Sequence, residues 1–180
     1  MNPAPNLVLV GPTGAGKTSI GKRLAERFGL AFVDVDHHVE QAAGSSIARM
    51  FENLGEAVFR KHERAALADL LAGEGRLVST GAGAVLDPAN RALIRHRGYV
   101  VHLHVGVDEQ LRRLARDNSR PLLRADDRAA TLRAMADMRT PLYRELADLS
   151  IDTDSLTSID ATGQLVLALA RDWQRPGAAA

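Results

Sequence analysis

Short apolar runs alternate along the chain with longer stretches in which apolar residues recur every three or four positions. The runs lie at residues 6–10, 31–35, 76–80, 99–105 and 149–153. Runs of this length between helical patterns are typical of buried strands in βαβ units. Strands buried on both faces belong to a parallel sheet that helices cover on each side. We therefore predict a three-layer α/β fold with a five-stranded parallel sheet.

The stretches between these runs predict helices with recognisable starts and breaks. The first five helices begin at about residue 17, after residue 46, at 57, at 88 and at about 108. Two more helices follow the loop described below and end at about residues 147 and 173. Pro88 after Asp87 is a start signal, because a proline in the first turn loses no hydrogen bond and the carboxylate caps free N–H groups. Residues 116–127 are polar, rich in arginine and broken by Pro121, which predicts a loop.

Neither a linker nor an internal repeat divides the chain, so we expect one domain over residues 1–175 and a frayed tail over 176–180. The 180 residues are 46% hydrophobic and 25% charged, as in ordinary globular domains. A formal net charge of +1 argues against a nucleic-acid-binding protein. No apolar run approaches the length of a membrane span, and the absence of cysteine is typical of a reducing compartment. We expect a soluble, cytoplasmic, monomeric enzyme.

Residues 11–18, GPTGAGKT, match the pattern G-x-x-x-x-G-K-[ST] between an expected strand and an expected helix. Glycines allow backbone N–H groups to converge on phosphate oxygens, while the lysine reaches the outer phosphates and the threonine hydroxyl binds Mg²⁺. The alternative is a glycine-rich turn with an exposed lysine, but motif and context together favour a nucleoside triphosphate site. We assign to this site Gly14, Ala15, Gly16, Lys17, Thr18 and Ser19.

Two acids, Asp34 and Asp36, follow the second apolar run. Residues i and i+2 of a strand point to the same face, and two like charges there are costly unless a cation or a substrate lies between them. In a phosphoryl transferase one carboxylate lies near the metal and another orients the attacking hydroxyl. The alternative is that the acids cap the following helix, with Asp36 as the capping residue.

Six segments in this order resemble the shikimate kinase family over nearly the whole chain. They are GPTGAGKT (11–18), DVD (34–36), FRKHE (59–63), GAGAV (81–85), RPLL (120–123) and RTPLY (139–143). The resemblance implies a P-loop kinase fold like that of nucleoside monophosphate kinases, with a substrate-binding helical segment at about 36–62 and a mobile lid at about 116–127. It implies transfer of the γ-phosphoryl group of ATP, with Mg²⁺, to the 3-hydroxyl of shikimate in aromatic amino-acid biosynthesis.

The resemblance also implies roles for individual residues. Asp34 and Thr18 would hold the metal, and Asp36 would hold and deprotonate the substrate hydroxyl. Arg60 and Arg139 would bind the shikimate carboxylate. The remaining implied roles are backbone contacts to the ring from Gly81, Ala82 and Gly83, closure on the transferring phosphate by Arg120, and an adenine-side contact from Arg113. Lys17, Asp36 and Arg120 would be the catalytic residues.

Ala82 stands where the family commonly has the middle of three glycines. If that position needs a positive φ, the alanine would be strained and the ring contact loosened. His102 and His104 share one strand face, but without an evident third ligand we expect a structural role rather than a metal site.

Three other functions would leave different features in the sequence. A gluconate-type kinase would keep the P-loop but has no evident need for both FRKHE and RTPLY. A GTPase would show an N-K-x-D motif, which this sequence lacks. A ligand-binding sensor would normally carry an added DNA-binding segment.

Overall fold

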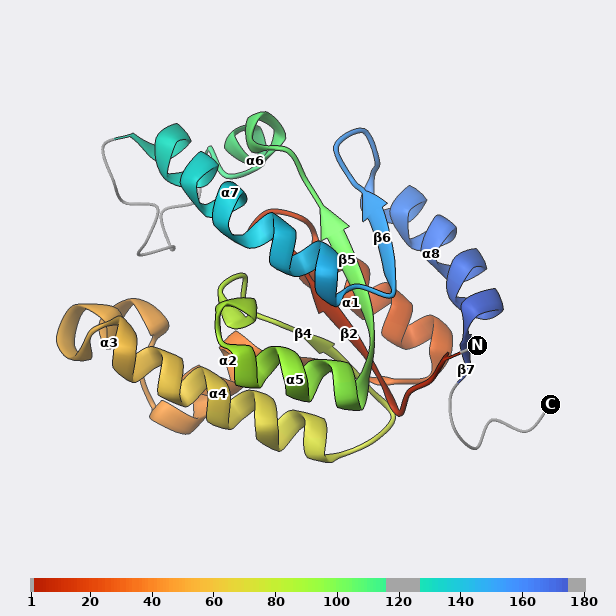
Figure 1. Cartoon of the computed structure of the whole chain (residues 1–180), viewed down its shortest axis with the longest axis horizontal. Coiled ribbons are helices and arrows are strands. Elements are labelled where there is room, and N and C mark those ends of the chain that lie inside the picture. Colours follow the sequence, from red (N-terminus) through yellow and green to blue (C-terminus); the bar gives the residue numbers. More distant parts are fainter. Residues whose placement is uncertain (1, 116–126, 175–180) are drawn as a thin grey trace.

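The computed structural model describes residues 2–115 and 127–174, with side chains described for 4–115 and 127–173 (Figure 1). The predicted strands form one parallel sheet in the order β3-β4-β2-β5-β6. Each matches a predicted run to within one residue at either end. The bounds are β2 Asn6–Val10, β3 Ala31–Asp34, β4 Arg76–Ser79, β5 Gly98–His104 and β6 Leu149–Asp152. The predicted parallel sheet is therefore confirmed.

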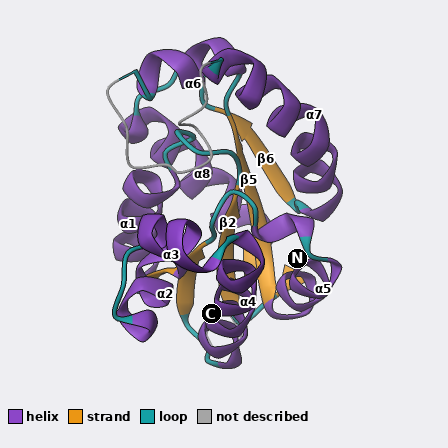
Figure 2. Ribbon diagram, turned by 90° about the vertical axis from the view of Figure 1, so that its left-hand side faces the viewer, coloured by secondary structure: helices purple, strands orange, loops and turns teal. Residues whose placement is uncertain are grey.

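Helices cover both faces of the sheet, which gives three layers (Figure 2). Their bounds are α1 Lys17–Phe28, α2 Val35–Ala43, α3 Ile47–Leu54, α4 Glu56–Ala72, α5 Pro88–Arg97, α6 Val107–Arg113, α7 Arg128–Leu146 and α8 Ser158–Asp172. A short 3-10 helix, η1, spans Ala84–Leu86. As predicted, Asp87 caps α5 and accepts a hydrogen bond from the Ala89 N–H at 2.8 Å.

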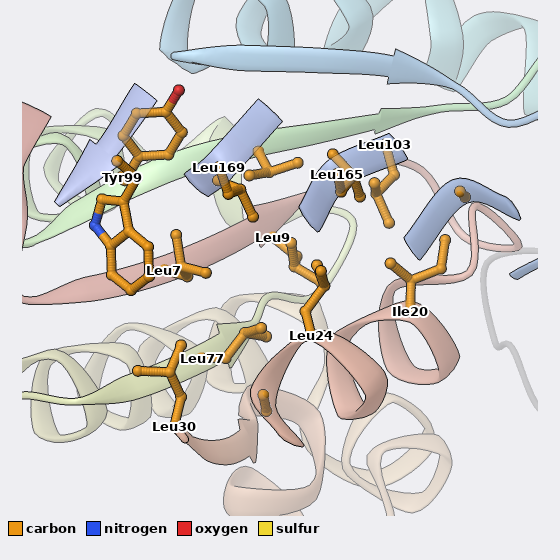
Figure 3. Packing of buried hydrophobic residues seen from close by; sticks show 14 of the residues in the cluster. Leu7, Leu9, Ile20, Leu24, Leu30, Leu77, Tyr99, Leu103, Leu165 and Leu169 are labelled. Atoms are coloured by element: carbon orange, nitrogen blue, oxygen red, sulfur yellow. The ribbon is translucent and has the colours of Figure 1, made fainter. Parts of the chain in front are cut away.

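Alternate residues of the central strand β2 face two separate cores. Leu7 and Leu9 pack with α1 and α8, where Leu24 and Leu165 lie close to them (Figure 3). Val8 and Val10 belong to the opposite core, with side chains from α2, α3, α4, α5 and α7. All of β2 is buried, because its residues are covered on both faces and paired on both edges.

The two ends of the described chain differ from the prediction. The last helix ends at Asp172, and β7 (Trp173–Gln174) pairs in parallel with β1 (Asn2–Pro3). The Trp173 indole N–H donates to the Ala4 carbonyl at 3.1 Å. A pair this short carries no periodic signal, so the sequence pattern missed it. The expected lid, apart from Asp127, and the expected tail lie outside the described residues.

The carboxyl ends of the parallel strands meet at one edge of the sheet, where ligands of open α/β sheets bind. The loop 11–16 follows β2, the loop 80–83 follows β4, and α2 and α6 follow β3 and β5. These four connections surround the candidate site. Among the described residues, no helix is both long enough and apolar enough to cross a membrane.

Candidate active site

The loop after β2 has the backbone of a phosphate-binding turn. Gly14 has φ 77° and Gly16 has φ 94°, values that strain a residue with a Cβ atom. Gly16 is also the N-cap of α1, and no side chain caps this helix end. The first N–H groups of α1 and the positive end of its dipole are therefore available to an anion. The helix end opens into a cavity of about 200 Å³ that Gly16, Lys17 and Thr18 help to line.

Lys17 and helix α6 fix the shape of this loop. The Lys17 ammonium donates to the Gly11 carbonyl at 2.7 Å and to the Pro12 carbonyl at 2.8 Å. From α6, the Gln110 side chain donates to the Thr13 carbonyl at 2.9 Å and Arg113 donates to the Gly14 carbonyl at 3.1 Å. Successive carbonyls of the loop are thus held by side-chain donors. Gln110 was not identified from the sequence, because a lone glutamine carries no motif.

Arg113 connects the phosphate loop to the segment after β6. Its guanidinium donates to the Thr153 carbonyl at 2.5 Å and to the Thr153 hydroxyl at 3.2 Å. Its Nε also donates to Glu109 at 2.6 Å. The residue assigned to the adenine side therefore lies at the edge of the nucleotide loop.

The two acids occupy different elements, so the argument that they share one face of a strand is wrong. Asp34 ends β3 and is the N-cap of α2, accepting from the His37 N–H at 3.2 Å. Asp36 lies in the first turn of that helix, so the capping residue is Asp34 and not Asp36. Because the cap starts the helix at Val35, the strand ends one residue earlier than predicted. Both carboxylates nevertheless line the same cavity as Lys17.

Thr18 and Asp34 provide a pair of oxygen donors beside the phosphate loop. The Thr18 hydroxyl donates to Asp34 Oδ2 at 3.3 Å. Within residues 2–115 and 127–174, no group of three or more His, Cys, Asp or Glu side chains could hold a metal alone. A cation at Thr18 and Asp34 would therefore take its other ligands from water and phosphate. Mg²⁺ is usually bound in this way, through one or two protein oxygens and the substrate phosphates.

A second charged group lies on α4. Arg60 Nη1 donates to Glu63 Oε2 at 2.8 Å, and Nη2 donates to Glu56 Oε1 at 3.0 Å. Arg60 and Glu63, three residues apart on the helix, therefore form an ion pair. Glu63 is only 1% exposed. Burial raises the pKa of Glu63 and the Asp36 carboxylate raises it further, while the charges of Arg60 and Arg139 act in the opposite direction.

The glycine loop after β4 packs directly against these charged groups. A Cβ atom on Gly81 would lie 2.7 Å from Glu63 Oε1 and 2.9 Å from Asp36 Oδ1. A Cβ atom on Gly83 would overlap the Arg60 guanidinium. A side chain at either position would therefore have to displace these charged groups. Among the described residues no non-glycine residue has a positive φ, so Ala82 is not strained.

Helix α7 closes this region with Arg139 and Tyr143. The Tyr143 hydroxyl donates to the Ala82 carbonyl at 2.5 Å. Burial raises the pKa of Tyr143 to about 12, and the nearby Arg139 guanidinium acts to lower it. Arg139 Nε and Glu63 Oε1 are buried and have no hydrogen-bond partner among the described residues. A buried donor and a buried acceptor without partners cost free energy, which a polar ligand would remove.

The structure thus brings most of the predicted site residues to one edge of the sheet. The nucleotide loop with Thr18, Asp34 and Asp36 lines the cavity together with Gly81 and Ala82. Arg60 lies against Gly83, and the charge of Arg139 acts on Glu63 beside Gly81. Arg120 lies outside the described residues. Tyr143 was missed as a site residue, although its place four residues after Arg139 on a helix puts both on one face.

His102 lies behind this region in β5. It is 1% exposed, and its ring stacks on that of Tyr143 with the centroids 5.3 Å apart. Burial lowers the pKa of His102 to about 4, and the charges of His104, Arg144 and Lys17 contribute. The imidazole is therefore neutral near pH 7.

Comparison with known proteins decides the family. A family model described as shikimate kinase matches residues 13–170. The chain belongs to the shikimate kinase family. It is 65% identical over 175 residues to a shikimate kinase of Stenotrophomonas maltophilia (strain R551-3), with 97% of each chain covered. A shikimate kinase of Xanthomonas campestris pv. campestris (strain 8004) is 60% identical over 174 residues, with 97% of each chain covered.

A solved structure of a shikimate kinase from Acinetobacter baumannii in complex with shikimate has a TM-score of 0.90 to this chain. The two are 39% identical, and 93% of each chain is covered. Fold and family therefore agree over nearly the entire chain.

Proposed function

We propose that the protein transfers the γ-phosphoryl group of ATP to the 3-hydroxyl of shikimate, giving shikimate 3-phosphate in the cytoplasm for aromatic amino-acid biosynthesis. Membership of the shikimate kinase family supports this reaction. The single observation that carries the acceptor site is the group of charged side chains around residues 81–83, where Arg139 Nε and Glu63 Oε1 are buried without partners. An acceptor that carries both a carboxylate and hydroxyl groups would satisfy both atoms, because the carboxylate can accept from Arg139 and a hydroxyl can donate to Glu63.

On the nucleotide side, the N-terminus of α1 and the loop glycines bind the phosphates of ATP. Lys17 leaves the carbonyls of its own loop for the outer phosphates, where its charge stabilises the transferring group. Thr18 and Asp34 would hold Mg²⁺, which would neutralise phosphate charge when bound. Arg113 contributes from the adenine side, and Arg120 supplies a further positive charge to the transferring phosphate.

On the acceptor side, Arg60 and Arg139 bind the carboxylate of shikimate. The planar guanidinium group pairs with a carboxylate through two parallel hydrogen bonds, which fixes orientation as well as position. The backbone of residues 81–83 contacts the ring. Asp36, which lines the cavity with Lys17 and lies beside Gly81, orients the attacking hydroxyl and accepts its proton.

ADP release, measured in a coupled assay with shikimate, quinate or gluconate as acceptor, tests this proposal. We expect release that depends on shikimate and none above background with gluconate, a linear acid that does not place a hydroxyl and a carboxylate on a rigid ring. Lys17→Ala provides the blank for contaminating ATPases. Equal release with gluconate and shikimate would show that the acceptor site is not built for a cyclic acid.

A further inference from the structure

Tyr143 joins the two segments that supply the proposed shikimate contacts. Its hydroxyl donates to the Ala82 carbonyl at 2.5 Å, across 61 residues of sequence. Ala82 lies in the glycine loop after β4, whereas Arg139 lies one helical turn before Tyr143 in α7. The Arg139 guanidinium lies close enough to the phenol for its charge to lower the pKa of Tyr143. One hydroxyl group therefore links the carbonyl of the loop to the helix that carries Arg139.

Tyr143 is in turn held from behind by the central sheet. Its ring stacks on His102 with an interplanar angle of 25°. His102 is a residue of β5, paired with Val10 of β2 on one side and with Ser150 of β6 on the other. Its Nδ1 lies 3.4 Å from the Ser150 hydroxyl. Because β5 is an inner strand, the tyrosine ring rests on a rigid part of the fold.

We infer that Tyr143, supported by His102, is a positioning residue for shikimate that fixes the glycine loop relative to Arg139. The substrate is contacted from both segments, so its affinity depends on their separation. Tyr143 acts through Ala82 and Arg139 rather than on the reacting atoms. This inference rests on the proposed function, because it assumes that both segments bind shikimate.

Tyr143→Phe tests the inference, since it removes the hydroxyl but keeps the ring that stacks on His102. We expect the KM for shikimate to rise about 5- to 10-fold, as for one lost hydrogen bond, with the KM for ATP unchanged. Tyr99→Phe is the matched control. Tyr99 is also buried, but it packs in the other core, with Leu7 and Trp173. Loss of the Tyr99 hydroxyl should leave the KM values for shikimate and for ATP unchanged.

The role of His102 is tested by a pair of variants. His102→Ala removes the support of the ring and should raise the KM for shikimate several-fold, whereas His102→Phe keeps a stacked ring and should restore a value near that of the wild type. The inference would be overturned if Tyr143→Phe lowered the melting temperature but left the KM for shikimate unchanged, while Arg139→Ala still raised that KM. Wild-type protein that does not phosphorylate shikimate would instead refute the proposed function.

Discussion

Gly83 has no room for a side chain, because the Arg60 guanidinium lies against it. Its φ of −89° suits any residue, so the requirement for glycine comes from the neighbour and not from the backbone. Arg60 is the end of a flexible side chain and can move, but its hydrogen bonds to Glu63 and Glu56 hold it in its present place. A substitution here therefore acts on the position of a binding group.

We expect Gly83→Ala to raise the KM for shikimate about 10-fold, because the displaced Arg60 loses a charge-assisted hydrogen bond. The free energy of unfolding should also fall, since the displaced arginine leaves the buried Glu63 carboxylate without its ion pair. Gly163→Ala in α8 is the control, because its Cβ would meet no atom within 4 Å. That variant should keep its KM and gain about 0.5–1 kcal/mol of stability from helix propensity. If steady-state kinetics gave Gly83→Ala a normal KM for shikimate, Arg60 would not be a substrate-binding residue.

At the scale of elements, the N-terminus of α5 depends on a single carboxylate. Asp87 Oδ1 accepts from the Ala89 N–H at 2.8 Å and also from Arg64 Nη2 at 2.8 Å. The hydrogen bond from Arg64 lowers the pKa of Asp87, and the backbone hydrogen bond from Ala89 contributes. The carboxylate is therefore charged at neutral pH, as a cap at the positive end of a helix should be.

Asp87→Ala should lower the free energy of unfolding by about 1 kcal/mol in urea titrations, the usual effect of losing an N-cap. Arg64→Ala removes the ion pair but leaves the cap, and because both side chains are partly exposed it should cost clearly less. Equal losses in the two variants would assign the stabilisation to the ion pair. Neither variant should change the kinetics with shikimate.

Apart from the short β1–β7 pair, the elements could be predicted from sequence because local chemistry fixes each of them. The strand 6–10 is an apolar run that ends at a glycine motif, and the start of α5 is set by Asp87 and Pro88. The acids at 34 and 36 show where local reasoning fails. The apolar run extends through Val35, but Asp34 caps the helix and the helix therefore begins at Val35. The cap and the hydrogen bond from Thr18 to Asp34 together outweighed the alternating strand pattern.

At the scale of the whole molecule, the parallel sheet made the convergence of the site predictable, because all strand ends meet at one edge. The contacts between segments far apart in sequence were not predictable. The hydrogen bond from Tyr143 to Ala82 and the stacking of His102 on Tyr143 depend on how α7 crosses the sheet. No local sequence pattern predicts how α7 crosses the sheet.

His102 makes the stability of the whole molecule depend on pH. Burial lowers its pKa from the ordinary 6.5 to about 4 in the folded protein. The unfolded chain therefore binds more protons between these values, so the stabilisation is present above about pH 6.5 and is lost as the pH falls toward 4. Between pH 7 and 4.5 the wild type should lose about 2 kcal/mol more than His102→Phe, which has no group to titrate.

Urea unfolding at pH 7, 5.5 and 4.5 measures this difference. A substitution of the exposed His96 to Gln serves as control and should leave the wild-type dependence intact. Parallel pH curves for the wild type and His102→Phe would show that the imidazole does not resist protonation in the folded state.

The most direct test of the proposed site is steady-state kinetics with shikimate for Asp36→Asn and Arg60→Ala. Arg60→Ala deletes a contact to a group that does not react, so it should chiefly raise the KM, by about 10- to 150-fold. Asp36→Asn keeps the shape but loses the charge that orients the attacking hydroxyl and accepts its proton, so kcat should fall by more than the KM rises. If Asp36→Asn turns over at the normal rate with only its KM raised, Asp36 is a binding group and the account of the chemistry is wrong.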